Sequence, residues 1–264
     1  MQISLNTSKC RWYDNIWAAF IFFTRLPLWR IHQPPKECYR TVVEYWPLTG
    51  WLTGGAAAGV LYTAGIFFPP HVALLMAMVS RILLTGALHE DGLCDFFDGF
   101  GGGGTNRQRI LDIMKDSRIG TYGVLGLVFY EALAFASLYA MPSWLAVWTI
   151  AVADPFAKMV AGQIIVMMPY ARTEEESKAK TVYRRISVKA GVSLTLQGLL
   201  PIGVYLYFFH GMVAIEFMVF MPCIVMYFLY LFIWKRLRGY TGDCCGALFL
   251  LTELSVYLAV NLSL

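Results

Sequence analysis

The sequence is poor in charged residues, and this scarcity indicates the class of protein. Of its 264 residues only 14% are Asp, Glu, Lys or Arg, whereas 58% are hydrophobic. Soluble domains usually carry about a quarter charged residues, so the composition argues against a soluble domain and predicts an integral membrane protein. The formal net charge of +4 is small and dispersed. Because no zinc-finger or helix-turn-helix pattern is present, we expect no nucleic-acid partner.

Other familiar motifs are missing as well. The six cysteines include no Cys-x-x-Cys spacing and no paired histidines accompany them, which argues against the common zinc sites. Adjacent residues such as Cys244 and Cys245 rarely bridge each other. We expect all six cysteines to be free thiols facing a reducing compartment. Residues 1–9 lack the charged start, apolar run and small-residue cleavage site of a removable signal peptide.

Long apolar runs dominate the chain. A helix needs about 20 apolar residues to cross the hydrocarbon core. The segment 15–29 is shorter, aromatic-rich and interrupted by Arg25 and Pro27, so it favours an interfacial helix. We predict an all-α, polytopic membrane bundle that forms one domain over residues 1–264, with residues 1–45 as an arm at the membrane surface. Its seven predicted spans are 46–68, 71–88, 120–141, 143–167, 190–209, 212–234 and 243–264.

The basic residues predict the orientation of this bundle. With seven spans, 19 of the 21 Lys and Arg residues fall in the N-terminal arm and in connections on the same side of the membrane. Connections rich in Lys and Arg face the cytoplasm. We therefore predict a protein of the cell inner membrane with its N-terminus inside and its C-terminus outside. Residues 89–119 then form an acidic cytoplasmic loop, where carboxylates avoid the cost of burial in lipid.

The acidic loop opens with HEDGLCDFFDGFGGGG, residues 89–104. If the preceding helix continues past Leu88, Asp91, Asp95 and Asp98 lie at i, i+4 and i+7 and share one helical face. Carboxylates so close together repel each other. Mg²⁺ relieves such repulsion, because it binds one or two carboxylates together with phosphate oxygens. The spacing therefore predicts that these three aspartates form a catalytic site.

We predict different roles for the aspartates of this site. Asp98 is the candidate to accept a proton from an attacking hydroxyl. The alternative is a solvated helix end whose acids pair with Arg107 or Arg109. The predicted metal ligands are Asp91, Asp95, Asp98 and Asp116.

The segment after the glycines predicts phosphate binding. Residues 107–118 carry an apolar stripe that fits a short amphipathic helix on the bilayer surface. Arg118 offers a bidentate fork to phosphate, although the alternative is an ordinary surface helix with internal ion pairs. Glycines permit close approach of backbone N–H groups, or form only a flexible turn. The candidate substrate-binding residues are Arg25, His89, Gly102, Gly103, Lys115, Ser117, Arg118, Thr241 and Asp243.

Two of these candidates have an equally simple structural interpretation. Thr241 and Asp243 stand at the start of the last span, where a helix N-terminus binds anions and where Thr or Asp also serves as a cap. Charges inside predicted spans are functional candidates by default. Asp154 and Lys158, however, are four residues apart and are expected to neutralise each other. The other intramembrane charges are Arg81 and Glu131.

Four motifs resemble a known family. The segments FFTRLP, GALHEDGLCDFFDG, IMKDSRIGTYGVL and GYTGDCCGA, spread over most of the chain, are similar to those of the cobalamin 5′-phosphate synthases, or adenosylcobinamide-GDP ribazoletransferases. Asp91, Gly92, Asp95 and Asp98 match the acidic motif of this family, and residues 116–118 match its second motif. Two departures are Glu90, where the family commonly has an apolar residue, and the Asp154/Lys158 pair. Neither departure is expected to take part in the chemistry.

The resemblance implies a polytopic membrane enzyme of cobalamin biosynthesis. A hydroxyl of α-ribazole, or of its 5′-phosphate, would attack the diphosphate of adenosylcobinamide-GDP, with Mg²⁺ as cofactor. GMP would leave, and adenosylcobalamin or its 5′-phosphate would form. Membrane lipid is an expected partner, and a homo-oligomer remains open.

Two other functions stay open from the residues alone. A lipid headgroup transferase of the CDP-alcohol phosphotransferase type uses a similar cluster of Asp and Gly on membrane helices. An ion-coupled transporter would instead favour charges at the membrane midplane in two repeated halves. The acidic residues of this chain lie close together at one membrane–water interface, which favours a transferase.

Overall fold

The computed structural model describes residues 10–172, 183 and 186–264, and over these residues it contains helices and no strand. This confirms the predicted all-α, polytopic membrane fold. Two 3-10 segments, η1 (Leu28–Arg30) and η2 (Lys36–Tyr45), follow the first α-helix. The α-helices are α1 (Trp12–Phe23), α2 (Trp46–Ala64), α3 (Pro70–Thr85), α4 (Leu88–Gly102), α5 (Arg107–Lys115), α6 (Thr121–Tyr139), α7 (Ser143–Gly162), α8 (Ile164–Met167), α9 (Val188–Phe208), α10 (Ile215–Leu237) and α11 (Gly242–Asn261).

Fewer helices than the predicted seven are apolar enough to span a membrane. Over the described ranges, five pass by length and composition, and the bent pair α3 and α4 makes a sixth if it is one span. The helix that falls short is α2, because its glycine, threonine and tryptophan residues lower its mean hydropathy. It nevertheless packs along α7, so it belongs to the bundle.

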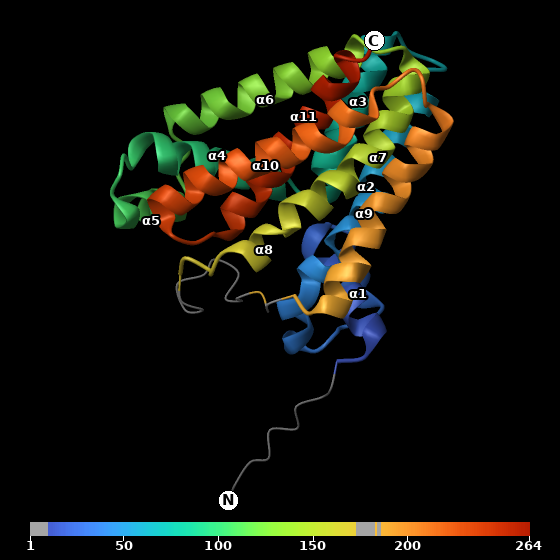
Figure 1. The fold of residues 1–264 in the computed structure, drawn as a ribbon. Helices are drawn as coiled ribbons and strands as arrows, with labels where there is room; N and C mark the ends of the chain where they lie inside the picture. Colours follow the sequence, from blue (N-terminus) through green and yellow to red (C-terminus); the bar gives the residue numbers. More distant parts are fainter. Residues whose placement is uncertain (1–9, 173–182, 184–185) are drawn as a thin grey trace, which may run out of the picture.

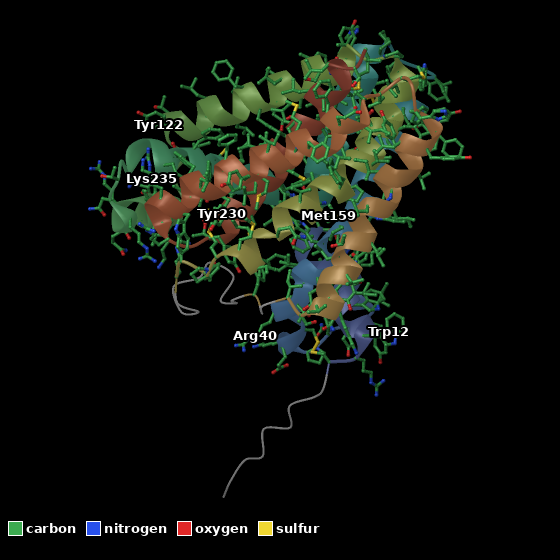
Figure 2. All side chains as sticks on the ribbon, viewed as in Figure 1. Trp12, Arg40, Tyr122, Met159, Tyr230 and Lys235 are labelled. Atoms are coloured by element: carbon green, nitrogen blue, oxygen red, sulfur yellow. A yellow bond between two sulfur atoms is a disulfide. The ribbon has the colours of Figure 1, made fainter. Side chains whose placement is uncertain are left out.

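The helices run in two groups that meet near the C-terminus and separate toward the opposite end (Figure 1). One group contains α4, α6, α10 and α11, the other α2 and α9, and α7 packs against α2, α9 and α11. Figure 2 places Lys235 and Arg40 at the separated end of the two groups. Of the basic residues predicted to share one side, five lie outside the described residues: Lys9, Lys178, Lys180, Arg184 and Arg185.

A sharp bend separates α3 from α4, so the helix expected to continue past Leu88 does not do so. The two helix axes differ by 89°. Gly86 (φ 67°) and Ala87 (φ 57°) both adopt left-handed conformations that end α3. The Arg25 backbone N–H donates to the carbonyl of Leu84 at 2.8 Å, and the Arg25 side chain lies where a Cβ on Gly86 would be. A side chain at position 86 would therefore clash with Arg25.

The predicted acidic loop at 89–119 is largely helical. α4 packs on α11 and α6, and α5 packs on α4. In α5, Ile110 and Met114 are fully buried, and a Cβ on Gly99 would come within 2.6 Å of the Met114 side chain. The amphipathic helix is confirmed, but its apolar face meets α4 and not the bilayer surface, because Gly99 leaves room for Met114.

The N-terminal arm folds back on itself. Cys10, before α1, and Cys38, in η2, form a disulfide with their Cα atoms 5.9 Å apart. The prediction of six free thiols is therefore wrong for this pair, because packing of α1 on η2 joins positions that sequence spacing leaves unrelated. Asp14 accepts from the Arg11 backbone N–H at 2.9 Å and contacts His32 at 2.6 Å. These contacts, the Arg11 bond above all, hold the pKa of Asp14 below its usual value.

Two ion pairs lie inside the bundle. The Asp154–Lys158 pair predicted from spacing is confirmed, with Lys158 Nζ 2.6 Å from Asp154 Oδ1 and both side chains fully buried. Thr53 adds a hydrogen bond from its hydroxyl to Asp154 Oδ2 at 2.6 Å. Arg81 Nη1 lies 2.6 Å from Glu253 Oε1. Burial of these charges is therefore compensated by direct contacts.

Replacing Arg81 by Met is expected to lower the free energy of unfolding by about 4 kcal/mol, because it leaves Glu253 buried without a cation. The double variant Arg81→Met/Glu253→Met removes both charges and should recover most of this loss. Reversible unfolding in mixed micelles measures both values. A double variant as unstable as the single one would contradict the pairing.

Candidate functional site

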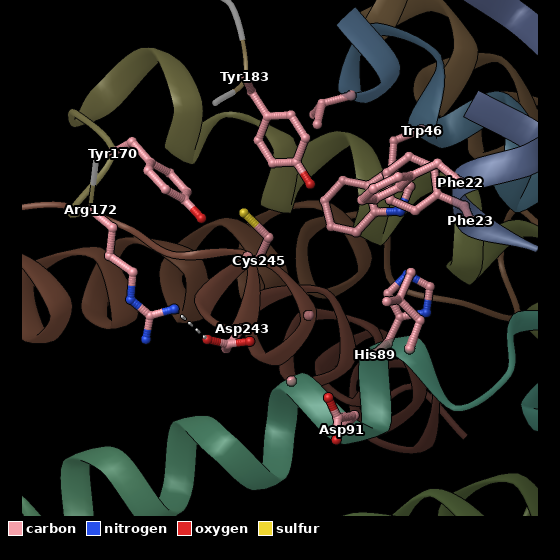
Figure 3. Close-up of a pocket in the computed structure, with 15 residues that line it drawn as sticks. Phe22, Phe23, Trp46, His89, Asp91, Tyr170, Arg172, Tyr183, Asp243 and Cys245 are labelled. Carbon is pink, nitrogen blue, oxygen red and sulfur yellow. Dashed lines mark ion pairs between the residues drawn. The ribbon is translucent and has the colours of Figure 1, made fainter. Parts of the chain in front are cut away.

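A cavity of about 130 Å³ lies between α4 and α11 on one side and α1, η2 and α2 on the other. Figure 3 shows Arg172 and Asp243 on one side of it and the rings of Phe22, Phe23 and Trp46 on the opposite side. We call the first the charged side, formed by Asp91, Arg172 and Asp243. We call the second the aromatic side, formed by Phe22, Phe23, Trp46 and His89.

Asp91 reaches the cavity because two glycines let α4 and α11 approach closely. A Cβ on Gly92 would lie 3.2 Å from Cα of Asp243, and a Cβ on Gly246 would lie 3.1 Å from the carbonyl oxygen of His89. Both distances are tighter than ordinary packing allows, so larger residues would separate the helices. The close crossing brings Asp91 and Asp243 to the same cavity.

Arg172 is positioned by a short backbone pairing. The Ala171 N–H donates to the carbonyl of Tyr240 at 2.8 Å, and the Tyr240 N–H donates to that of Pro169 at 3.0 Å. This brings Arg172 Nη1 to 3.9 Å from Asp243 Oδ2, while its Nη2 donates to the carbonyl of Leu111 at 2.9 Å. The guanidinium is therefore held in place at the cavity.

The start of α11 has a side-chain cap. The Thr241 hydroxyl accepts from the Cys244 backbone N–H at 3.2 Å and is fully buried. Thr241 is thus the N-cap of α11. Asp243 lies in the first helical turn, where the helix dipole favours a carboxylate, and it also lines the cavity.

Asp98 lies on the predicted face of α4, but its carboxylate has backbone partners. It accepts from the Gly120 N–H at 2.6 Å and from the Gly123 N–H at 2.8 Å. These donors belong to the N-terminus of α6, whose first N–H groups have no partner within the helix. A Cβ on Gly120 or Gly123 would fall within 2.5 Å of the carboxylate. Asp98 therefore caps α6 and joins it to α4.

The predicted ligands do not form one tight cluster. Among the described residues, no group of three or more His, Cys, Asp or Glu side chains is arranged to hold a metal ion. Asp95 is half-buried on α4. Asp116 is held by Arg118, whose Nη2 lies 2.7 Å from Asp116 Oδ2. The side-chain hydrogen bond from Arg118 lowers the pKa of Asp116 to about 2, so Asp116 is ionised at neutral pH.

Several predicted substrate-binding residues lie away from the cavity. Gly102 and Gly103 are at the end of α4, and a Cβ on Gly103 would lie 2.4 Å from the Ile110 side chain. Helix C-termini present carbonyls and not N–H groups, so this position suits packing better than phosphate binding. Lys115 and Ser117 are exposed, as are Arg25 and Arg118. The structure brings His89, Asp91 and Asp243 together at the cavity, and not these other residues.

Sequence reasoning missed most of the aromatic side and Arg172. Phe22 and Phe23 belong to the motif that drew attention to Arg25, but their aromatic character fitted an interfacial helix equally well. Arg172 counted only as one more basic residue of its loop. No spacing signal links it to Asp243, because the link depends on the pairing of residues 169–171 with Tyr240.

The cavity combines two kinds of recognition. Its carboxylates suit a hard cation or hydroxyl groups, and Arg172 suits phosphate oxygens. The aromatic side suits a flat ring. A substrate that contains both a phosphate and an aromatic base would fit this arrangement, and a diphosphate could be held against both charges.

The sequence is similar to proteins of one known family. The profile of the cobalamin-5-phosphate synthase family matches residues 15–261. An adenosylcobinamide-GDP ribazoletransferase of Vibrio parahaemolyticus is 36% identical over 247 residues, which cover 92% of this chain and 89% of that protein. A protein of the same name from Leptospira interrogans is 29% identical over 255 residues, 95% of this chain and 96% of that protein. No solved structure matches the chain.

Proposed function

Because the chain belongs to the cobalamin-5-phosphate synthase family, we propose that it transfers the cobinamide phosphate of adenosylcobinamide-GDP to α-ribazole or α-ribazole 5′-phosphate in the cavity between α4 and α11. A hydroxyl of the ribazole attacks the phosphorus that carries cobinamide. The bond from this phosphorus to the bridging oxygen breaks, and GMP leaves with that oxygen. The observation that supports this site is the meeting of Asp91, Arg172 and Asp243 around one cavity.

The carboxylates of this cavity fit Mg²⁺. Asp91 and Asp243 both line it, and Mg²⁺ needs only one or two carboxylates when phosphate oxygens complete its coordination. Asp95 lies one helical turn from Asp91 on the same face and would extend the site. Bound there, Mg²⁺ would neutralise the diphosphate and the leaving GMP.

The protein side chains would align the reactants. Arg172 is held by Leu111 and Asp243, so it can bind a phosphate oxygen with little loss of its own freedom. Asp91 is the exposed carboxylate of the cavity and is placed to accept the hydroxyl proton or to bind the metal. Asp98 would act indirectly, because it fixes α6 against α4.

The test uses the full chain in lipid nanodiscs with adenosylcobinamide-GDP, α-ribazole and Mg²⁺. We expect corrinoid product and GMP in equal amounts, and no turnover after chelation of Mg²⁺. Parallel arms supply a labelled CDP-alcohol, or measure uptake of labelled cobinamide into sealed vesicles. Headgroup transfer or uptake without GMP release would contradict the proposal.

We also propose that the cavity opens to the cytoplasm at the inner membrane. Basic residues of α5 and α10 lie near the cavity, because Arg107 donates to the carbonyls of Leu237, at the end of α10, and of Ala171, next to the cavity residue Arg172. Such residues favour the cytoplasmic side. The Cys10–Cys38 disulfide alone would favour an oxidising compartment. The charge pattern involves several connections of the chain, whereas the disulfide lies in the N-terminal arm alone.

Labelling of introduced cysteines tests this orientation. Ser117 and Ser143 are both exposed, and they stand at opposite ends of α6, because Ser117 precedes this helix and Ser143 follows it. Ser117→Cys should react with an impermeant maleimide in inside-out vesicles, and Ser143→Cys in right-side-out vesicles. Labelling of the unmodified protein gives the background from its own cysteines. The reverse pattern would place the cavity outside.

A further inference from the structure

We propose that the aromatic side of the cavity binds the benzimidazole ring of α-ribazole. The inference rests on the proposed function, because it assigns one substrate of that reaction to one side of the same cavity. It is carried by the rings of Phe23, Trp46 and His89, by the size of the cavity and by two buried ring nitrogens.

The three rings are nearly parallel and stack on one another. The ring centroids of Phe23 and Trp46 are 5.4 Å apart with an interplanar angle of 15°. Those of Trp46 and His89 are 5.9 Å apart at 22°. Phe22 adds an edge contact to the ring of Tyr183 at 6.3 Å, and Tyr183 lies between the aromatic and charged sides (Figure 3). A flat heterocycle can extend such a stack in an offset arrangement.

The short distance between the two sides of the cavity favours the benzimidazole of α-ribazole over the guanine of the nucleotide. In α-ribazole, only the sugar separates the ring from the attacking hydroxyl. In adenosylcobinamide-GDP, a sugar and a further phosphate separate guanine from the phosphorus under attack. The charged and aromatic sides share one cavity of about 130 Å³, so the ring with the shorter connection fits better.

The polar groups of the aromatic side agree with this choice. Trp46 Nε1 and His89 Nε2 are buried and have no hydrogen-bond partner within the described part of the chain. Buried donors normally have a partner, and the indole N–H can act only as a donor. The free ring nitrogen of a benzimidazole is an acceptor, and the remainder of that ring is apolar. Guanine would leave several donors and acceptors on its edge without partners.

Binding and kinetics of Trp46→Phe test the proposal, since Phe keeps a ring and removes only the N–H. We expect the Kd and KM for α-ribazole to rise about fivefold, as for loss of one neutral hydrogen bond, with the KM for adenosylcobinamide-GDP unchanged. The control is Trp51→Phe on the same helix, where the indole donates to the carbonyl of Gln197 at 2.8 Å, away from the cavity. A thermal melt of each variant shows that it is folded.

A second probe is the riboside of dimethylindole, in which the free ring nitrogen is replaced by carbon. The unmodified protein should bind it about fivefold more weakly than α-ribazole, whereas Trp46→Phe should bind both equally. A raised KM for adenosylcobinamide-GDP alone, or a preference for α-ribazole that survives in Trp46→Phe, would overturn the assignment.

Direct binding separates this inference from the proposed function. The Kd for α-ribazole is measured by calorimetry without the second substrate, so it does not depend on turnover. Binding that is weakened by Trp46→Phe, together with no GMP release by the unmodified protein, would support the aromatic site and refute the proposed reaction. GMP release with unchanged α-ribazole binding in Trp46→Phe would refute the aromatic site alone.

Discussion

Replacing Asp91 by Asn is expected to lower kcat for GMP release about a thousandfold. Asp91 is the exposed carboxylate that α4 presents to the cavity. Its loss would remove negative charge where we propose that Mg²⁺ meets the diphosphate, and such contacts contribute several kcal/mol to the transition state. The measurement is GMP release in nanodiscs at saturating concentrations of both substrates.

The matched control for Asp91→Asn is Asp112→Asn. Asp112 is exposed on α5 and accepts from the Gln108 side chain at 2.9 Å, and it does not line the cavity. We expect the control to turn over at nearly the normal rate. Near-normal turnover of Asp91→Asn, with Mg²⁺ dependence intact, would remove Asp91 from the mechanism.

Replacing Asp98 by Ala is expected to lower the free energy of unfolding by about 3 kcal/mol. The carboxylate accepts from two backbone N–H groups of α6, at 2.6 and 2.8 Å, and hydrogen bonds to a buried charge are among the stronger ones. Asp98→Asn keeps one acceptor oxygen, so this variant should lower the free energy of unfolding by less. Chemical unfolding in mixed micelles measures both variants.

Activity decides whether Asp98, in addition to capping α6, is the predicted proton acceptor. If it acts only as a cap, Asp98→Asn should keep measurable activity per folded molecule, with a pH profile like that of the unmodified protein. If Asp98→Asn is as stable as the unmodified protein and yet shows no GMP release, Asp98 takes part directly in the reaction.

Much of the fold could be predicted because membrane helices leave strong local signals. The length of the apolar runs predicts the helices, and the four-residue spacing of Asp154 and Lys158 predicts their ion pair. The spacing of Asp91, Asp95 and Asp98 gives their common helix. These are properties of one segment, or of residues one turn apart.

The features that the sequence did not reveal depend on contacts between distant segments. The bend at Gly86 depends on Arg25, the cap of α6 depends on Asp98, and the place of Arg172 depends on its pairing with Tyr240. The Cys10–Cys38 disulfide requires the arm to fold back. None of these contacts leaves a periodic pattern, so a single sequence does not predict them.

The buried Asp154–Lys158 pair of α7 is connected to the cavity through the ring of Phe249. The ammonium of Lys158 lies 4.8 Å from the centre of the Phe249 ring, and this ring meets the imidazole of His89 with centroids 4.7 Å apart. Phe249 thus lies between a fully buried ammonium and the imidazole of the aromatic side. A cation over an aromatic face is held more strongly where water is excluded, so the dry interior of the bundle would help to fix the position of His89.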